Sequence, residues 1–124
     1  MRQTDPEKIK QGRALIEELI KERGGALETH RKMANDPRLL GAFLASYKNC
    51  ETDCVIPQKY HEMIVMAIGV ATGSEQTIRV HGNRAIEAGA TMDEIGEVLR
   101  ILLFTVGVTK VNPAMILLEE LPEE

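Results

Sequence analysis

Aromatic residues are scarce in this sequence, which has no tryptophan, two phenylalanines and two tyrosines among 124 residues. A hydrophobic core must therefore be built from aliphatic side chains and methionine. Proteins that bind nucleic acids rely on a dense positive surface or on aromatic stacking. The net charge here is −4, and the basic residues form no stripe along the chain. We therefore expect no nucleic-acid partner.

Long hydrophobic runs are also missing. The longest, such as MIVMAIGVA, fall well short of the roughly 20 residues that a membrane-spanning helix needs. The N-terminal stretch MRQTDPEKIK contains no hydrophobic segment typical of a signal peptide. We expect a soluble, cytoplasmic protein without a membrane partner, whose two cysteines are mostly reduced unless they are catalytic or redox-sensing.

The sequence does contain 44% hydrophobic residues with charges interleaved, which is typical of a single globular domain over residues 1–124. Helix boundaries recur in its N-terminal half. An acid followed by proline is typical of a helix start, and a glycine pair is typical of a helix end. These signals are Asp5-Pro6, Gly24-Gly25 and Asp36-Pro37, with a further segment expected over residues 26–35.

The C-terminal half carries the same kind of pattern. Thr91 and Glu94 have the spacing of a capping box at the start of a helix, and residues 107–112 are expected to be a break. The other helices are expected over residues 57–71, through His81 to Gly89, and over residues 113–121. No strand-like alternation appears, so the sequence predicts an all-α fold with six or seven helices.

Two segments, residues 63–71 and 101–108, are hydrophobic around the whole helix. Such helices are normally buried on all sides, which is difficult in so small a chain. Either the two segments form a tight central hairpin, or part of their surface is an oligomer interface. We favour a homo-oligomer on this ground, because obligate interfaces resemble a protein core.

His81 is a candidate catalytic residue because of the side chains expected beside it. Ser74, Thr77 and His81 are three and four residues apart and so share one helix face. Free backbone N–H groups at the start of that helix favour an anion. Glu62, on the preceding helix, could hold the tautomer of the imidazole ring and raise its basicity.

A purely structural interpretation is also open. Thr72 and Glu75 are themselves spaced as a capping box, so that Ser74 would only support it. His81 could be a hydrogen-bonded packing residue, and Glu62 could be a surface acid.

The hydrophobic helix led by Glu62 is followed by the stretches GSEQTIRVH, AIEAGAT and DEIGEVL. In these features the segment 60–121 resembles the carboxymuconolactone decarboxylase family, which includes the AhpD-like alkylhydroperoxidases. The N-terminal helices share only general helical character with the family. The resemblance implies an AhpD-like all-α fold that assembles as a homo-oligomer, a trimer or a hexamer.

AhpD-like members carry a glutamate on one helix, then a Cys-x-x-Cys pair and a histidine four residues later on the next. Glu62, Ser74, Thr77 and His81 match these four positions, with Gln76 inside the pair. Hydroxyl groups thus replace the redox cysteines. Because serine and threonine neither attack peroxide as thiolates do nor form disulfides, peroxidase chemistry at these positions is not expected.

The decarboxylase branch of the family resembles this sequence more closely in its site, since it keeps the glutamate and the histidine without the cysteine pair. This likeness implies that Glu62 and His81 pass a proton as a small lactone acid loses carbon dioxide. A helix N-terminus and a nearby cation would hold the carboxylate. Arg79 and Arg84 are the local cations, although both could be solvated instead.

Cys50 and Cys54 are the only cysteines in the chain and are spaced C-x-x-x-C. They could come close enough to pair on a helical turn or across a loop, as a redox pair displaced from the helix and facing the same pocket. The alternative is two inert thiols. A zinc site that used them with His61 or His81 would match no common spacing, so we expect no metal and no other cofactor.

Three functions follow from these observations. The first is a decarboxylase-like enzyme in which Glu62 and His81 transfer a proton on a small carboxylated substrate. The second is a thiol-dependent peroxidase or disulfide oxidoreductase that uses Cys50 and Cys54. The third is a non-catalytic oligomer that binds small molecules or has a structural role.

Overall fold

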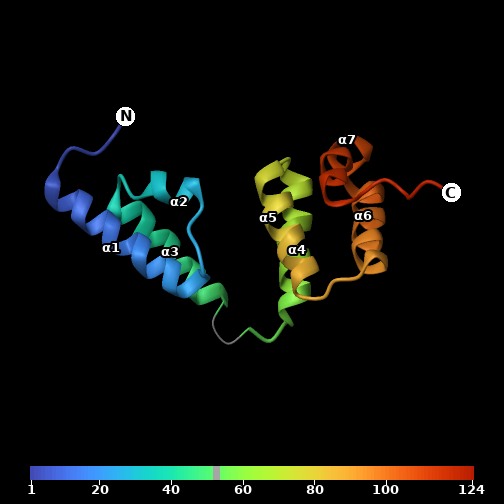
Figure 1. Ribbon diagram of the computed structural model, residues 1–124, viewed down its shortest axis with the longest axis horizontal. Coiled ribbons are helices and arrows are strands. Elements are labelled where there is room, and N and C mark those ends of the chain that lie inside the picture. The colour runs from blue at the N-terminus through green and yellow to red at the C-terminus, as the bar shows by residue number, and fades with distance from the viewer. Residues whose placement is uncertain (52–53) are drawn as a thin grey trace. The chain divides into compact units, whose positions relative to one another are not determined.

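The computed structural model describes residues 1–51 and 54–124 and is helical throughout its regular parts (Figure 1). Over these residues it contains seven α-helices, one 3-10 helix and no strand, which confirms the predicted all-α fold. The chain divides into two compact units, residues 1–54 and residues 55–124. Each unit has a hydrophobic core of its own.

The first unit contains α1 (Pro6–Arg23), α2 (Glu28–Met33) and α3 (Pro37–Glu51). Its helix boundaries follow the predicted signals. Asp5 Oδ1 accepts the backbone N–H groups of residues 7 and 8 at the start of α1. Gly24 ends α1 in the left-handed conformation, with φ at 84°, which glycine adopts without steric cost.

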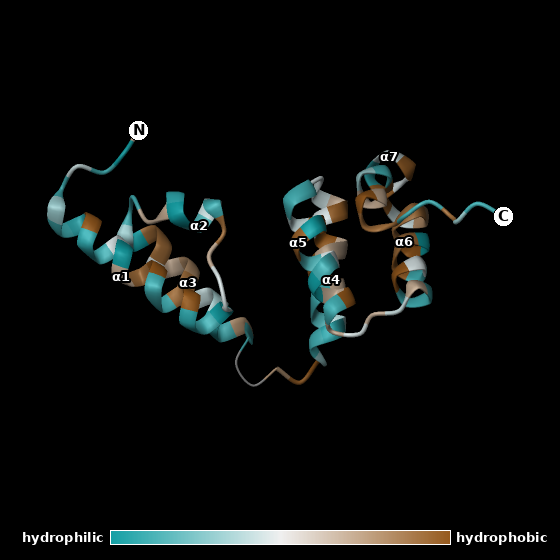
Figure 2. Cartoon of the chain, viewed as in Figure 1, coloured by the Kyte–Doolittle hydropathy of each residue, from teal (hydrophilic) through white to brown (hydrophobic). Residues whose placement is uncertain are grey.

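Helices α1 and α3 lie side by side, and Figure 2 shows hydrophobic residues between them. The core they share is aliphatic, as the lack of aromatic residues requires, and consists of Ile16, Leu19, Leu40 and Leu44. His30 lies beside this core, 5% exposed, with its ring 4.7 Å from that of Phe43. Its Nδ1 accepts the backbone N–H of Leu27, so this histidine is part of the packing.

The second unit contains α4 (Gln58–Thr72), α5 (Glu75–Glu87), α6 (Met92–Val106), α7 (Val108–Val111) and the 3-10 helix η1 (Asn112–Leu117). The capping box of Thr91 and Glu94 at the start of α6 is confirmed. The buried side chains of this unit come from all five elements and include Met66, Val70, Ile78, Ile95, Leu102, Val111 and Ala114.

The start of α5 differs from the predicted capping box. Thr72 is the last residue of α4, and its hydroxyl donates to the carbonyl oxygen of Ile68 at 2.7 Å. Ser74 is the N-cap of α5 and accepts the backbone N–H of Thr77. The left-handed Gly73 and the N-cap Ser74 lie between the two helices, so α5 is capped two residues later than a Thr72–Glu75 capping box would place its start.

The end of the chain also differs from the prediction. The expected break over residues 107–112 holds the short helix α7, and the expected final helix is a 3-10 helix that ends at Leu117. Pro113 lies in its first turn and has no N–H to donate, and the tighter 3-10 turns suit so short a segment.

Helices α4 and α5 form a helical hairpin (Figure 1), and they approach each other closely at Gly69. A Cβ atom on Gly69 would lie 2.9 Å from Thr77 Cγ2 and 3.0 Å from the backbone nitrogen of Ile78. Only glycine fits at this position without a shift of the neighbouring helix. The close contact fixes the spacing of the two helices that carry the candidate site.

Several large hydrophobic residues of the second unit are exposed. We call six of them the exposed hydrophobic set: Ile64, Ile68, Ile101, Leu103, Phe104 and Val108. They come from the two segments that the sequence marks as hydrophobic on all sides, and Figure 2 shows hydrophobic residues along α6 together with hydrophilic ones. No helix in the described part of the chain is both long and hydrophobic enough to cross a membrane.

Candidate active site

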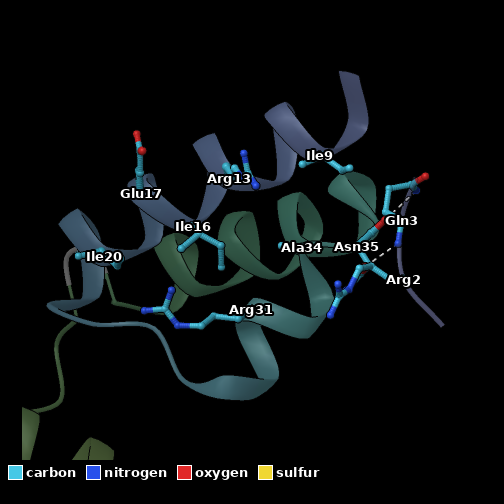
Figure 3. A pocket seen from close by; sticks show the side chains of 10 residues that line it. All are labelled: Arg2, Gln3, Ile9, Arg13, Ile16, Glu17, Ile20, Arg31, Ala34 and Asn35. Carbon is cyan, nitrogen blue, oxygen red and sulfur yellow. Dashed lines mark hydrogen bonds between the residues drawn. The ribbon is translucent and has the colours of Figure 1, made fainter. Parts of the chain in front are cut away.

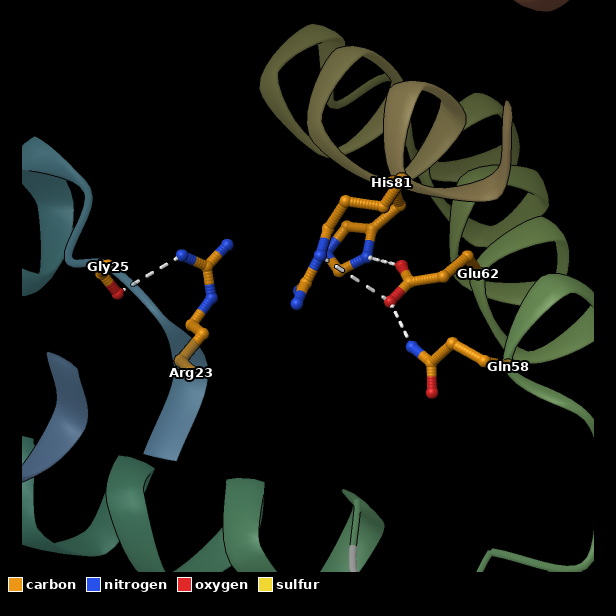
Figure 4. Close-up of polar contacts among 6 residues, drawn as sticks. Arg23, Gly25, Gln58, Glu62 and His81 are labelled. Atoms are coloured by element: carbon orange, nitrogen blue, oxygen red, sulfur yellow. Dashed lines mark hydrogen bonds and ion pairs between the residues drawn. The ribbon is translucent and has the colours of Figure 1, made fainter. Parts of the chain in front are cut away.

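Glu62 and His81 meet across the α4–α5 hairpin. Glu62 lies in the second turn of α4 and His81 in the second turn of α5. The distance from His81 Nδ1 to Glu62 Oε2 is 2.6 Å (Figure 4). The structure thus brings together the acid and the imidazole that the sequence singles out.

The Glu62 side chain is completely buried, whereas that of His81 is 24% exposed. Burial alone would raise the pKa of Glu62. The hydrogen bond with His81 and the positive charge of Arg84 have the opposite effect and prevail, so that the pKa of Glu62 lies below its ordinary value. Glu62 is therefore ionised at neutral pH.

An ionised Glu62 determines the tautomer of His81. A carboxylate can only accept hydrogen bonds, so the proton of the ring must be on Nδ1. The other nitrogen, Nε2, then carries a lone pair, and it makes no hydrogen bond within the described residues. A partly exposed imidazole held in this way can accept a proton at Nε2 and return it.

Gln58 is a site residue that the sequence reasoning missed. It lies one turn before Glu62 on α4, and its Nε2 donates to Glu62 Oε1 at 2.7 Å (Figure 4). Each carboxylate oxygen of Glu62 therefore has its own partner, and this fixes the plane of the carboxylate. The spacing of four residues on a predicted helix is a signal that could have identified Gln58.

Arg84 is the cation nearest to the pair. Its Nε is 3.7 Å from Glu62 Oε1, which is an ion pair but not a hydrogen bond. Its Nη1 is buried and has no hydrogen-bond partner among the described residues. Most buried donors in proteins are paired, so an unpaired one calls for an explanation. The Arg84 side chain as a whole is 27% exposed.

The other predicted residues of this region lie differently. Arg79 is exposed on α5 and forms no ion pair with Glu62. The Ser74 hydroxyl lies 2.8 Å from Thr77 Oγ1 and accepts the Thr77 backbone N–H, so the two hydroxyls bind each other. Gln76 is exposed beside them. Ser74 and Thr77 serve as a helix cap here.

Cys50 and Cys54 belong to the first unit. Cys50 lies in the last turn of α3, and both side chains are exposed and not joined by a disulfide. Residues 52 and 53 of the C-x-x-x-C stretch lie outside the described residues. Within the described part, no group of three or more His, Cys, Asp or Glu side chains is arranged to hold a metal ion.

Fold and site together define an all-helical protein whose buried carboxylate orients a partly exposed imidazole. A model of the carboxymuconolactone decarboxylase family matches residues 37–120, more than half of the chain, and the chain belongs to this family. The match begins earlier than the segment 60–121 that resembled the family by its motifs, and it includes α3. Searches of curated proteins and of solved structures each found no match.

Proposed function

We propose that the protein is a proton-transfer enzyme of the decarboxylase or lyase type that acts on a small carboxylated substrate. The observation that carries the proposal is the contact of 2.6 Å between the buried Glu62 and His81. It leaves Nε2 of a partly exposed ring as the proton-accepting atom. Membership of the family supports this class of chemistry but does not define the substrate.

In the proposed reaction the bond between the substrate carbon and its carboxylate breaks, and carbon dioxide leaves. The electron pair remains on the substrate, where a neighbouring carbonyl or lactone group delocalises it. His81, protonated at Nε2, then delivers its proton to that carbon, and it regains a proton from water. Glu62 stays ionised and stabilises the imidazolium form of His81.

Arg84 supports the proposal from the substrate side. Its guanidinium is held near Glu62 and has a donor without a partner. Arginine binds carboxylates through paired N–H donors. We assign Arg84 the role of holding the substrate carboxylate or a second carboxylate of the same molecule, and we expect Arg79 to have no such role.

The test is a panel of small lactone acids, with carbon dioxide release and deuterium incorporation from heavy water as the two readouts. We expect both to be lost in His81→Ala and to fall at least about a hundredfold in Glu62→Gln, because positioned proton transfer contributes about 10²–10⁴-fold. Arg84→Gln should raise KM, while the matched variant Arg79→Gln should leave it unchanged. Turnover of a lactone acid that survives His81→Ala would refute the proposal.

The exposed thiols Cys50 and Cys54 favour a second candidate. An accessible thiolate can attack a hydroperoxide to give a sulfenic acid and an alcohol, and the second thiol can then form a disulfide with loss of water. An external dithiol must reduce that disulfide. Cys50→Ser should abolish such activity, whereas lactone-acid turnover should be unaffected by this change or by thiol alkylation.

We also propose that the working form is a homo-oligomer, a trimer or a hexamer. The exposed hydrophobic set supports this, because single-chain soluble proteins seldom expose so many large hydrophobic side chains in one unit. If no lactone acid and no hydroperoxide is turned over by this assembly, the remaining function is a non-catalytic binding protein.

A further inference from the structure

The first unit contains a groove that lies apart in sequence from the Glu62–His81 site. It is formed by α1, by the end of α2 and by the N-terminal residues, and its volume is about 610 Å³ (Figure 3). This volume is in the range of small-molecule sites, about 300–1,000 Å³. The residues that line it are numbered 2–35 and precede the segment that matches the family.

The floor of the groove is hydrophobic. Ile9, Ile16 and Ile20 are spaced seven and four residues apart and so lie on one face of α1. Ile20 remains 38% exposed. An apolar ligand body placed along this face would remove aliphatic surface from water.

Three arginines surround this floor: Arg2, Arg13 and Arg31. Glu17 is the only acid among the lining residues that are described, and Figure 3 shows its carboxylate pointing away from Arg2 and Arg31. No ion pair or hydrogen bond of these three guanidinium groups occurs within the described residues. Three positive charges against one negative charge leave the groove with a net positive lining.

The groove is held in shape at one end. The backbone N–H of Gln3 donates to Asn35 Oδ1 at 2.8 Å, and Gln3 Nε2 donates to the carbonyl oxygen of Asn35 at 3.0 Å. Gly12 brings α1 so close to Ala34 that a Cβ atom there would lie 2.2 Å from the Ala34 oxygen. These contacts fasten the N-terminal segment and the end of α2 to the rest of the unit.

We propose that this groove binds an organic anion with a hydrophobic body, an alkyl or aryl carboxylate whose head group is held by Arg13 and Arg31. A hydrophobic floor with unpaired guanidinium groups at its rim is complementary to such a molecule in both shape and charge. Its lining residues all belong to the first unit, whereas Glu62 and His81 belong to the second, and the proposal does not depend on the function proposed above.

The test is titration calorimetry of the full-length protein with decanoate below its micelle-forming concentration, with 1-decanol and decyltrimethylammonium as ligands that lack the negative charge. Decanoate should bind in a saturable, salt-sensitive manner, and both controls should bind more weakly. The double variant Arg13→Gln/Arg31→Gln should weaken decanoate binding about tenfold or more. Arg38→Gln, a substitution of an exposed arginine that does not line the groove, should not.

Two further variants locate the site. Ile20→Thr, at a floor position that is 38% exposed, should weaken binding of decanoate, and Glu62→Gln should leave it unchanged. Equal binding in Arg13→Gln/Arg31→Gln and Arg38→Gln would overturn the proposal, as would loss of binding in Glu62→Gln. Failure of the wild-type protein to bind decanoate would also overturn it. If the double variant in that case alters the oligomeric state, the groove is an interface between copies.

Discussion

A single amide determines how firmly the carboxylate of Glu62 is held. Gln58 contacts one oxygen of Glu62 and His81 contacts the other, so both oxygens of a completely buried group are paired. Without Gln58, one oxygen would have only the more distant Arg84 Nε, at 3.7 Å. Burial penalises a charge that lacks hydrogen bonds, so Gln58 should influence both the pKa and the orientation of Glu62.

We therefore predict that Gln58→Leu makes the protein less stable in a pH-dependent way. Because the folded-state pKa of Glu62 lies below 4.5, its ionised form stabilises the folded protein above about pH 4.5, and this contribution is lost as the pH falls below that value. The variant should lower the free energy of unfolding by about 1–2 kcal/mol at neutral pH. The difference from the wild type should shrink as Glu62 becomes protonated.

Urea unfolding at a series of pH values measures this difference. Gln11→Leu is the matched control, because Gln11 also contacts a glutamate four residues away but in an exposed pair, which should contribute little. A loss of stability in Gln58→Leu that is the same at neutral pH and well below pH 4.5 would show that the amide acts through packing alone.

The sequence allows the pairing of Glu62 and His81 to be predicted, because family likeness and helical spacing place them on consecutive helices. It does not allow the state of Arg84 to be predicted. Arg79 and Arg84 are both arginines on the predicted helix that carries His81, and the sequence does not distinguish them. In the described part of the structure only Arg84 forms an ion pair with Glu62. That distinction depends on the rotation of α5 about its axis, which packing against α4 determines.

The α4–α5 hairpin is the element that sets the geometry of the site. The sequence predicts a helix start where an acidic N-cap residue precedes a proline, as at Asp5, or where a capping box is present, as at Thr91. It does not predict the start of α5, because Thr72 and Ser74 are both good capping residues. The left-handed conformation of Gly73 ends α4 and makes Ser74 the N-cap of α5. The presence of a glycine at position 73 does not by itself predict that conformation.

We predict that Gly69→Ala disturbs this element. The added Cβ would contact Thr77 and Ile78 at 2.9–3.0 Å, so α5 must move away, at a cost of about 1–3 kcal/mol. The same movement would lengthen the contact between Glu62 and His81, and lactone-acid turnover should fall with stability. Thermal unfolding and activity measured side by side would show both effects.

Gly96→Ala is the control, since this glycine is also inside a helix of the second unit. A Cβ atom added at Gly96 would lie no closer than 3.8 Å to the nearest side-chain atom, which belongs to Met92. Alanine should there be neutral or stabilising by roughly 0.5–1 kcal/mol. Equal stability of the Gly69 and Gly96 variants would contradict the view that close helix contact at Gly69 positions the site.

At the scale of the whole molecule, the exposed hydrophobic set bears on the two structural interpretations that the sequence left open. A tight central hairpin would leave residues 63–71 and 101–108 covered within the second unit. Instead, Ile68 is 55% exposed and Phe104 is 91% exposed. The hydrophobic pattern alone could not predict this exposure, because it shows which residues avoid water but not which surface they pack against.

We predict that the double variant Ile101→Lys/Phe104→Lys lowers the oligomeric state of the protein. Charged side chains in a hydrophobic interface lack partners and lose the favourable burial of the residues they replace. Sedimentation velocity should find a trimer or hexamer for the wild type and smaller species for the variant. Leu121→Lys, at a position that is 92% exposed beyond the last helix, should have no effect. A wild-type protein that sediments as a monomer at micromolar concentration would refute the assembly.

The contact between Ser74 and Thr77 also bears on how this scaffold could change its chemistry. The two oxygens lie 2.8 Å apart, and the sulfurs of a disulfide bond lie about 2.0 Å apart. Cysteine at position 74 would exchange only an oxygen for a sulfur, whereas cysteine at position 77 would also remove the Thr77 methyl group. Two substitutions thus separate a dithiol form of this backbone from the present one, and neither alters Glu62 or His81.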